Sequence, residues 1–307
     1  MESEYGHEYH QEDLVLDLSL VPDWRFEPGS GLWEFGKPLS EIQINHNSET
    51  VKVAPEIMAL KKSLEAKTSA NLFNGPLASV DSLKINDSGF SIDTKETDFY
   101  TYLASSYHHR DQVGNNPIRP LSVQATIFAP HGEKIILEKR PESLEDNPGK
   151  LSVFGGSLKP GEYPNEAILK IINHKLGLDL ATEQVQPTGL VRENINNIIC
   201  ITYSIELNEN QYESGYQRVK DLMRHRERMF YQVSTKESAH SLERILTGKR
   251  TINRWDPNGF FNLLYALGAK GLRDRQSLEA IMASNTAALS KSPMEYSYPI
   301  KKYLNLK

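Results

Sequence analysis

The chain has 307 residues, with 35 Lys plus Arg against 40 Asp plus Glu, which gives a net charge of −5 with neutral His. Such a chain is long enough for about two domains, and a hydrophobic content of 38% is ordinary for a globular protein. The acidic balance argues against bulk nucleic-acid binding, but it is compatible with a small basic pocket for a phosphorylated ligand. The single Cys200 excludes an internal disulfide framework and a Cys-rich zinc site, and its apolar neighbours predict a buried thiol.

The opening of the chain is acidic and polar rather than basic and then apolar, so we expect no targeting peptide. No run of about 18 consecutive apolar residues occurs, and we therefore expect no transmembrane helix and no membrane partner. A cytoplasmic location follows as the expectation.

The first third of the chain predicts a mixed set of short elements. Residues 13–35 are apolar but rich in Pro and Gly, which predicts short strands and turns. Residues 54–67 carry apolar side chains at helical spacing, with Pro55 at a first-turn position, and predict an amphipathic helix. A strand pair at 77–85 and 90–94 and a helix at 98–107 follow, the helix with Asp98 or Thr97 as its N-cap.

The Pro- and Gly-containing loop at 108–120 separates this part from the next, so we expect an amino-terminal module at 1–115, a larger domain at 116–285 and a tail at 286–307. The larger domain should open on a β-hairpin formed by 121–128 and 134–139. Its further expected elements are strands at 151–154, 185–192, 197–207 and 229–234 and helices at 164–176, 219–228, 238–248 and 259–272, the first helix ended by Gly177 and the last capped by a turn at 255–259.

The segment from Lys139 to Leu178 carries the most specific motif. Two glycines, Gly155 and Gly156, follow a short apolar strand, and Glu162 then precedes a helix that ends in Gly177 and Leu178. This pattern resembles the box of the Nudix superfamily, G-x5-E-x7-R-E-U-x-E-E-x-G-U, where U is a bulky aliphatic residue. The resemblance extends over residues 121–272 and implies an α+β protein: a Nudix-type α/β/α sandwich with a mixed sheet, preceded by a smaller α+β amino-terminal module.

The catalytic part of the box is different here. The family's Arg-Glu is Lys170-Ile171 in this chain, and its Glu-Glu is His174-Lys175. In the family this helix face gathers carboxylates around Mg²⁺, whereas imidazole is a poor Mg²⁺ ligand and an ammonium group repels the ion. We therefore expect no metal cofactor, and we expect Ile171 to pack in the core beside Ile168 and Ile172.

The remaining carboxylates define the catalytic candidates. Glu162 and Glu166 are the two catalytic candidates, and they are also the expected ligands if the chain binds a metal ion. Glu166 and Lys170 are four residues apart, so they are equally well spaced for a simple surface ion pair. Glu138 and Glu193 are further candidates, which we interpret as solvated strand residues. If the chain is a hydrolase, Mg²⁺ is the expected cofactor.

The expected partner is a small phosphorylated ligand, with a protein partner as the alternative. Six residues in and around the box are candidates to bind the ligand: Arg140, Gly155, Gly156, Lys170, His174 and Lys175. A basic run further on is interpreted as a solvated helix face, or else as a surface for phosphate or an anionic partner: Arg218, Lys220, Arg224, His225, Arg226 and Arg228. Residues 73–107 show a looser similarity to the region before the catalytic domain of UDP-sugar-hydrolysing Nudix proteins.

Three hypotheses for function follow. The first is a Nudix-fold protein with a degenerate box that binds a nucleoside-diphosphate-linked ligand, a nucleotide or nucleotide-sugar, with impaired or absent hydrolysis. The second is a divergent Mg²⁺-dependent hydrolase of such ligands. The third is a non-enzymatic interaction scaffold, because a fold alone does not fix a function.

Overall fold

A computed structural model describes residues 41–67, 74–86, 89–109, 116–140, 149–193, 198–224, 229–235, 246, 255–273, 276–278 and 280–281. The strands expected at 13–35, most of the helix expected at 238–248, and the tail at 286–307 lie outside these residues, as do positions 115 and 285, so the domain boundaries stay predictions. Within the part that is described, no helix is both long enough and apolar enough to cross a membrane.

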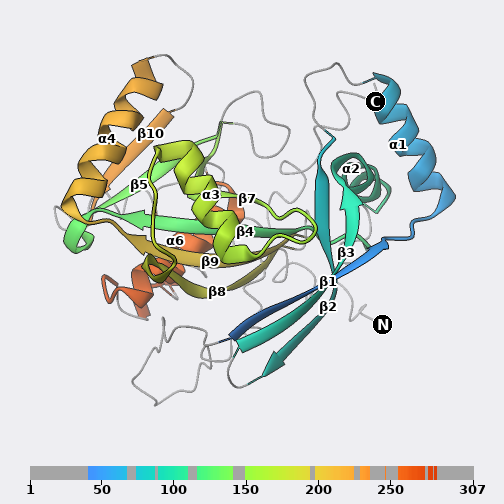
Figure 1. The fold of residues 1–307 in the computed structure, drawn as a ribbon, viewed down its shortest axis with the longest axis horizontal. Helices are drawn as coiled ribbons and strands as arrows, with labels where there is room; N and C mark the ends of the chain where they lie inside the picture. The colour runs from blue at the N-terminus through green and yellow to red at the C-terminus, as the bar shows by residue number, and fades with distance from the viewer. Residues whose placement is uncertain are drawn as a thin grey trace, which may run out of the picture.

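Near the amino terminus, a three-stranded sheet packs with two helices (Figure 1). Its strand order is β1-β3-β2, with β1 parallel and β2 antiparallel to β3. The elements are β1 (Glu41–Thr50), α1 (Pro55–Lys67), β2 (Pro76–Asn86), β3 (Gly89–Asp98) and α2 (Phe99–His108). The predicted helices and strand pair are confirmed, and Asp98 caps α2 by accepting a hydrogen bond from the Thr101 N–H at 3.0 Å.

A larger mixed sheet of seven strands forms the centre of the molecule (Figure 1). Its main order is β10-β5-β4-β9-β8, with β6 paired to β5 and β7 paired to β4. Strands β4 and β9 run parallel, and the other pairs are antiparallel. The strands are β4 (Leu121–Phe128), β5 (Lys134–Lys139), β6 (Leu151–Ser152), β7 (Phe154–Ser157), β8 (Val185–Glu193), β9 (Ile198–Glu206) and β10 (Met229–Ser234). The predicted hairpin of β4 and β5 is confirmed.

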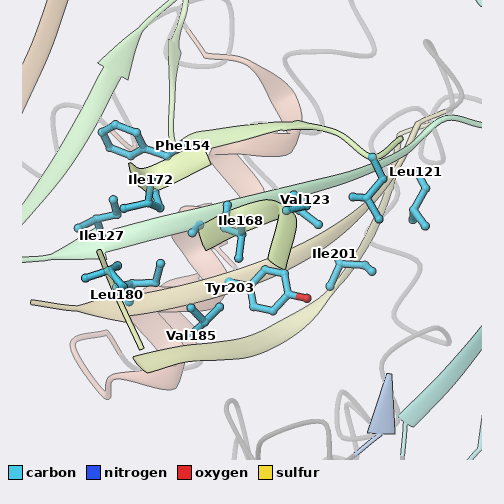
Figure 2. Packing of buried hydrophobic residues seen from close by; sticks show 14 of the residues in the cluster. Leu121, Val123, Ile127, Phe154, Ile168, Ile172, Leu180, Val185, Ile201 and Tyr203 are labelled. Carbon is cyan, nitrogen blue, oxygen red and sulfur yellow. The ribbon is translucent and has the colours of Figure 1, made fainter. Parts of the chain in front are cut away.

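Helices cover both faces of the larger sheet. Successive residues of a strand point to opposite faces, so the packing of neighbouring residues shows which helix covers each face. Ile136 packs in the same core cluster as α3 (Pro164–Leu176), whereas its neighbours Ile135 and Leu137 pack with α6 (Pro257–Ala269). Figure 2 shows Ile168 and Ile172 of α3 beside the side chains of β4. The expected α/β/α sandwich with a mixed sheet is therefore confirmed.

Two predicted elements need correction. The single strand expected at 151–154 is two strands, β6 and β7, because the segment changes its partner from β5 to β4 at Val153. The helix expected at 219–228 is α4 (Glu209–Arg224), which begins ten residues earlier than predicted, and residues 225–228 lie outside the described part. Gly215 lies inside α4 where the helix approaches Leu178 closely, since a Cβ there would lie 3.2 Å from the Leu178 Cδ1.

The two sheets are joined directly. The Ala78 N–H of β2 donates to the Leu158 carbonyl at 2.9 Å, and the Val80 N–H donates to the Arg119 carbonyl at 2.8 Å. Apolar residues of all three amino-terminal strands also belong to the core cluster that contains α3: Ile44, Ala78, Val80, Phe90 and Ile92. The amino-terminal sheet is thus packed against the segment that leads into α3.

Candidate functional site

Helix α3 carries the box residues, and its ends have local causes. Pro164 occupies the first turn, where a missing N–H costs nothing, and Gly177 ends the helix in the left-handed conformation at φ 68°. The prediction of this helix and of its glycine stop is confirmed. The apolar face of α3 is buried against the sheet, and the polar residues of the box lie on the remaining surface of the helix.

At the carboxyl end of α3, Lys175 forms a buried ion pair with Glu138 of β5. The Lys175 Nζ lies 2.6 Å from the Glu138 Oε2, and the side chains are only 15% and 5% exposed. Nζ also donates to the Gly155 carbonyl at 3.4 Å and lies 5.8 Å from the centre of the Phe154 ring. The interpretation of Glu138 as a solvated strand residue is therefore wrong, because α3 covers the face of β5 to which this side chain points.

Gly155 is required where strand β7 passes β4. A Cβ on Gly155 would lie 2.3 Å from the Gln124 Cγ and 2.6 Å from the Val123 carbonyl oxygen, so any other residue would force the strands apart. Gly156 is next to the box helix itself, since a Cβ there would meet the Ile171 Cδ1 at 3.2 Å. The two glycines therefore bring the β7 backbone close to its neighbours.

At the amino end of α3, the two predicted catalytic carboxylates share one lysine. The Lys170 Nζ lies 3.2 Å from Glu162 and 3.8 Å from Glu166. Lys170 and Glu166 are more than 60% exposed, whereas the Glu162 side chain is only 17% exposed. The Glu162 carboxylate also accepts from the Lys159 N–H at 3.3 Å, within its own loop. The i,i+4 ion pair between Glu166 and Lys170 is confirmed.

The other candidates are spread around these two ends. His174 is exposed on α3, and Arg140 lies just after β5, in the turn where its backbone pairs with Gly149 and Lys150. Glu193 ends β8, which β4 and β9 separate from β5, so it is not a neighbour of Glu138 in the sheet.

Ile171 is half-buried rather than fully buried. Its side chain packs against the core cluster and faces Gly156, while Ile168 and Ile172 are completely buried. The expected packing of Ile171 against the core is therefore confirmed, and its partial exposure places it at the rim of the apolar stripe.

These residues do not fit the Mg²⁺ site that the resemblance implies. Mg²⁺ requires several oxygen ligands in octahedral geometry, and the helix face offers Ile171, His174 and Lys175 instead. Among the described residues, no group of three or more His, Cys, Asp or Glu side chains is arranged to hold a metal ion. The Glu138 carboxylate could offer oxygen ligands to a metal ion near this end of α3, but it is paired with the Lys175 ammonium group.

A contact that the sequence did not predict holds the loop before α3. The Gly161 N–H donates to the Nδ1 atom of His46 in β1 at 3.2 Å, and the His46 ring packs edge-on against Tyr163 at 6.0 Å. Because His46 and Gly161 are distant in sequence, only the packing of the two sheets brings them together. The loop that carries Glu162 is thus bound to the amino-terminal sheet.

Comparison with known proteins gives similarity of structure only. No family model matches the sequence, and no curated protein matches it. A MutT/nudix family protein from Listeria innocua is similar over 49% of this chain and 92% of its own, at 16% identity and a TM-score of 0.37. A MutT/nudix family protein from Enterococcus faecalis covers 34% of this chain and 42% of its own, at 12% identity and a TM-score of 0.28. A MutT protein from Methanosarcina mazei is similar over 29% of this chain and 65% of its own, at 24% identity and a TM-score of 0.25.

The class of the central domain is an α/β/α sandwich with a mixed sheet, as the strand order and the two covering helices show. Within that class, the glycines, the acid and the helix of its box are similar in sequence to the Nudix box. The proposals below are argued from this chain's own residues.

Proposed function

We propose that this protein binds a nucleoside-diphosphate-linked ligand, a nucleotide or nucleotide-sugar, without hydrolysing it through a box-held Mg²⁺ ion. The observation that carries the proposal is the buried pair of Lys175 and Glu138, which sets an ammonium group at a box position where the family has a carboxylate. A divalent ion would have to displace that group before it could reach the Glu138 oxygen atoms.

The choice of ligand rests on the resemblance and on the charges that remain. The glycine pair and the box helix are retained, and in the family this arrangement serves a diphosphate. Lys170, in the middle of α3, is 64% exposed, and Arg140 lies half-buried beside the end of β5. Lysine and arginine bind phosphate oxygens directly, so these residues supply positive charge in place of a metal.

A nucleotide and nucleotide-sugar library, measured by thermal shift and by phosphate release with Mg²⁺ or Mn²⁺, tests the proposal. We expect at least one ligand to raise the melting temperature with no turnover, because a ligand that binds only the native state stabilises it. Lys170→Ala and Arg140→Ala should reduce that rise. Lys95→Ala is the matched control, since Lys95 forms its ion pair with Asp81 on the other sheet at 3.0 Å.

The other outcomes select the alternatives. Metal-dependent turnover that is lost in Glu162→Gln would replace the binding proposal with the divergent hydrolase. A chain that neither binds nor turns over any member of the library would support the interaction scaffold. The divergent hydrolase is tested because Glu162, the glutamate of the box that this chain has, is present and only 17% exposed.

A further inference from the structure

We infer that His46 is a pH-sensitive contact between the amino-terminal sheet and the loop that carries Glu162. The neutral His46 ring holds this loop by accepting a hydrogen bond from the Gly161 N–H, and a proton added to the ring breaks that bond. Acid therefore loosens the loop from the sheet. The contact involves no ligand, so it does not rest on the proposed function.

The hydrogen bond fixes which nitrogen of the neutral ring carries the proton. The Gly161 N–H donates to Nδ1 of His46 at 3.2 Å, so Nδ1 presents its lone pair and the proton of the neutral ring is on Nε2. Nε2 is buried and has no hydrogen-bond partner in the part of the chain that the structure describes. The next proton that the ring takes up must therefore go to Nδ1, the atom that receives the Gly161 N–H.

Thr94 gives the charged ring an alternative hydrogen bond. Its Oγ1 lies 3.0 Å from Nδ1 of His46, because the two residues are paired in strands β1 and β3. A hydroxyl group can donate or accept, whereas the Gly161 N–H can only donate. When Nδ1 is protonated, it can donate to Thr94, whose own proton can go to the Asn45 carbonyl at 3.5 Å. The contact within the sheet is then kept, and two N–H groups face each other at the loop.

The charged side chains of the amino-terminal sheet do not hold the ring in one protonation state. Glu96 shares the face of Thr94 two residues further along β3, and among the described residues no ion pair joins it to His46. Other charged side chains of this sheet lie on its opposite face or pair there: Asp93 and Lys95 of β3, and Glu49 of β1 at 3.9 Å from Lys95.

The charges of the loop and of α3 are engaged with one another. The Glu162 carboxylate accepts from the Lys159 N–H at 3.3 Å and lies 3.2 Å from the Lys170 Nζ, and Glu166 lies 3.8 Å from the same Nζ. The titratable Tyr163 meets the His46 ring only edge-on, with 6.0 Å between the ring centres. Within the described part of the loop, no group therefore replaces the lost hydrogen bond when the ring becomes charged.

The affected segment leads directly to the candidate site. The Ala78 N–H fixes one end of the loop by donating to the Leu158 carbonyl, and α3 begins at Pro164. Between these points, Gly161 and Tyr163 contact His46, while Glu162 lies between them in the chain. Histidine is the side chain whose charge changes between about pH 5 and pH 8, so the loop should be held at the upper end of this range and loosened at the lower end.

NMR of the full-length chain, labelled with ¹⁵N in its histidines and glycines, tests the contact at about pH 7.5 and about pH 5.5. His46→Asn places an amide oxygen near the position of Nδ1 and takes up no proton in this range, whereas His46→Ala removes the acceptor. The matched control is His131→Asn, because His131 lies in the turn after β4 with a side chain that is 79% exposed.

We expect the parent's ring signals to show His46 protonated on Nε2 alone at the higher pH and on both nitrogens at the lower pH. Exchange of the Gly161 amide with water, corrected for its intrinsic pH dependence, should then be about 2- to 10-fold faster at the lower pH, the effect of losing one hydrogen bond. His46→Asn should exchange slowly and His46→Ala rapidly at both pH values. His131→Asn should behave like the parent.

Three results would overturn the inference. The first is a His46 ring in the parent that stays neutral at the lower pH, and the second is a charged ring with unchanged corrected exchange at Gly161. The third is the same pH-dependent rise in His46→Asn, which would assign the effect to another group. All three are measured without His46→Ala, so the test holds even if that variant does not fold. None depends on nucleotide binding, which the thermal-shift library measures separately.

Discussion

The two ends of α3 each pair lysine with glutamate, but their environments differ. At the amino end, Lys170 is 64% exposed and lies 3.2 Å and 3.8 Å from two carboxylates. At the carboxyl end, Lys175 is 15% exposed and lies 2.6 Å from the Glu138 carboxylate, which is almost fully buried. An exposed pair gains little because water and salt screen it, whereas a buried pair must stay intact to avoid a bare charge in the core.

This difference predicts separate roles for the two ends of the box helix. The carboxyl end fastens the helix to strand β5 and contributes mainly to the fold. The amino end keeps its charged groups in contact with solvent, where a ligand could reach them. Substitutions at the two ends should therefore separate stability from binding, and the predictions below are ordered from the largest expected effect to the smallest.

The largest effect is expected for Lys175→Met. Breaking a buried ion pair by removing one partner costs about 3–5 kcal/mol of unfolding free energy, which urea denaturation measures. A double variant, Lys175→Met/Glu138→Leu, should recover most of the loss because neither charge remains in the core. A cost below about 1 kcal/mol for the single variant would mean that the carboxyl end behaves like an exposed pair.

Two adjacent isoleucines sharpen the comparison without any charge. Ile172 is completely buried, so Ile172→Ala should cost about 2–5 kcal/mol in the same denaturation assay. Ile171 is half-buried at the rim, and Ile171→Ala should cost less, about 1–2 kcal/mol. Equal costs for the two variants would show that Ile171 belongs to the core after all.

The Lys61–Asp98 pair in the amino-terminal part is intermediate in burial, with side chains 17% and 25% exposed and 2.6 Å between charged atoms. Burial alone would raise the pKa of Asp98, but hydrogen bonds from Lys61 and Thr101 outweigh it and hold that pKa below its ordinary value. Because the unfolded chain binds this proton more tightly, the stabilisation is present above the ordinary Asp pKa and is lost as the pH falls through the lowered value.

Asp98→Ala should therefore destabilise the protein at neutral pH by about 0.5–2 kcal/mol, the usual cost of a lost helix cap. The difference between variant and parent should shrink in acid, where the parent's carboxyl group is protonated. Denaturation at several pH values measures this. A difference that stays constant down to pH values well below the ordinary Asp pKa would contradict the assigned role.

The smallest effect is expected for Lys170→Ala. Removing one member of an exposed pair should change the unfolding free energy by at most about 1 kcal/mol, and added salt should reduce even that change. The same substitution should nevertheless weaken binding of a phosphorylated ligand, as proposed above. If Lys170→Ala were as destabilising as Lys175→Met, the contrast between the two ends of α3 would be wrong.

The sequence alone determined the local features. Apolar spacing and punctuation by Pro and Gly were enough for α3, for its stop at Gly177 and for the hairpin of β4 and β5. Asp98 was recognised as an N-cap candidate, and the ion pair of Glu166 and Lys170 followed from their spacing of four residues. Each of these depends on residues that are close in the chain, which is why a local pattern predicts them.

Only the tertiary structure decided the features that join distant segments. Strand β1 was not predicted, because its mostly polar sequence becomes a strand by parallel pairing with β3, more than forty residues away. Glu138 and Lys175 are 37 residues apart, and nothing in the pattern of β5 says which of its faces α3 will cover. A strand pattern fixes which side chains share a face, but only packing decides whether that face meets water or a helix. Glu138 is the buried partner of Lys175 because α3 packs on its face of β5.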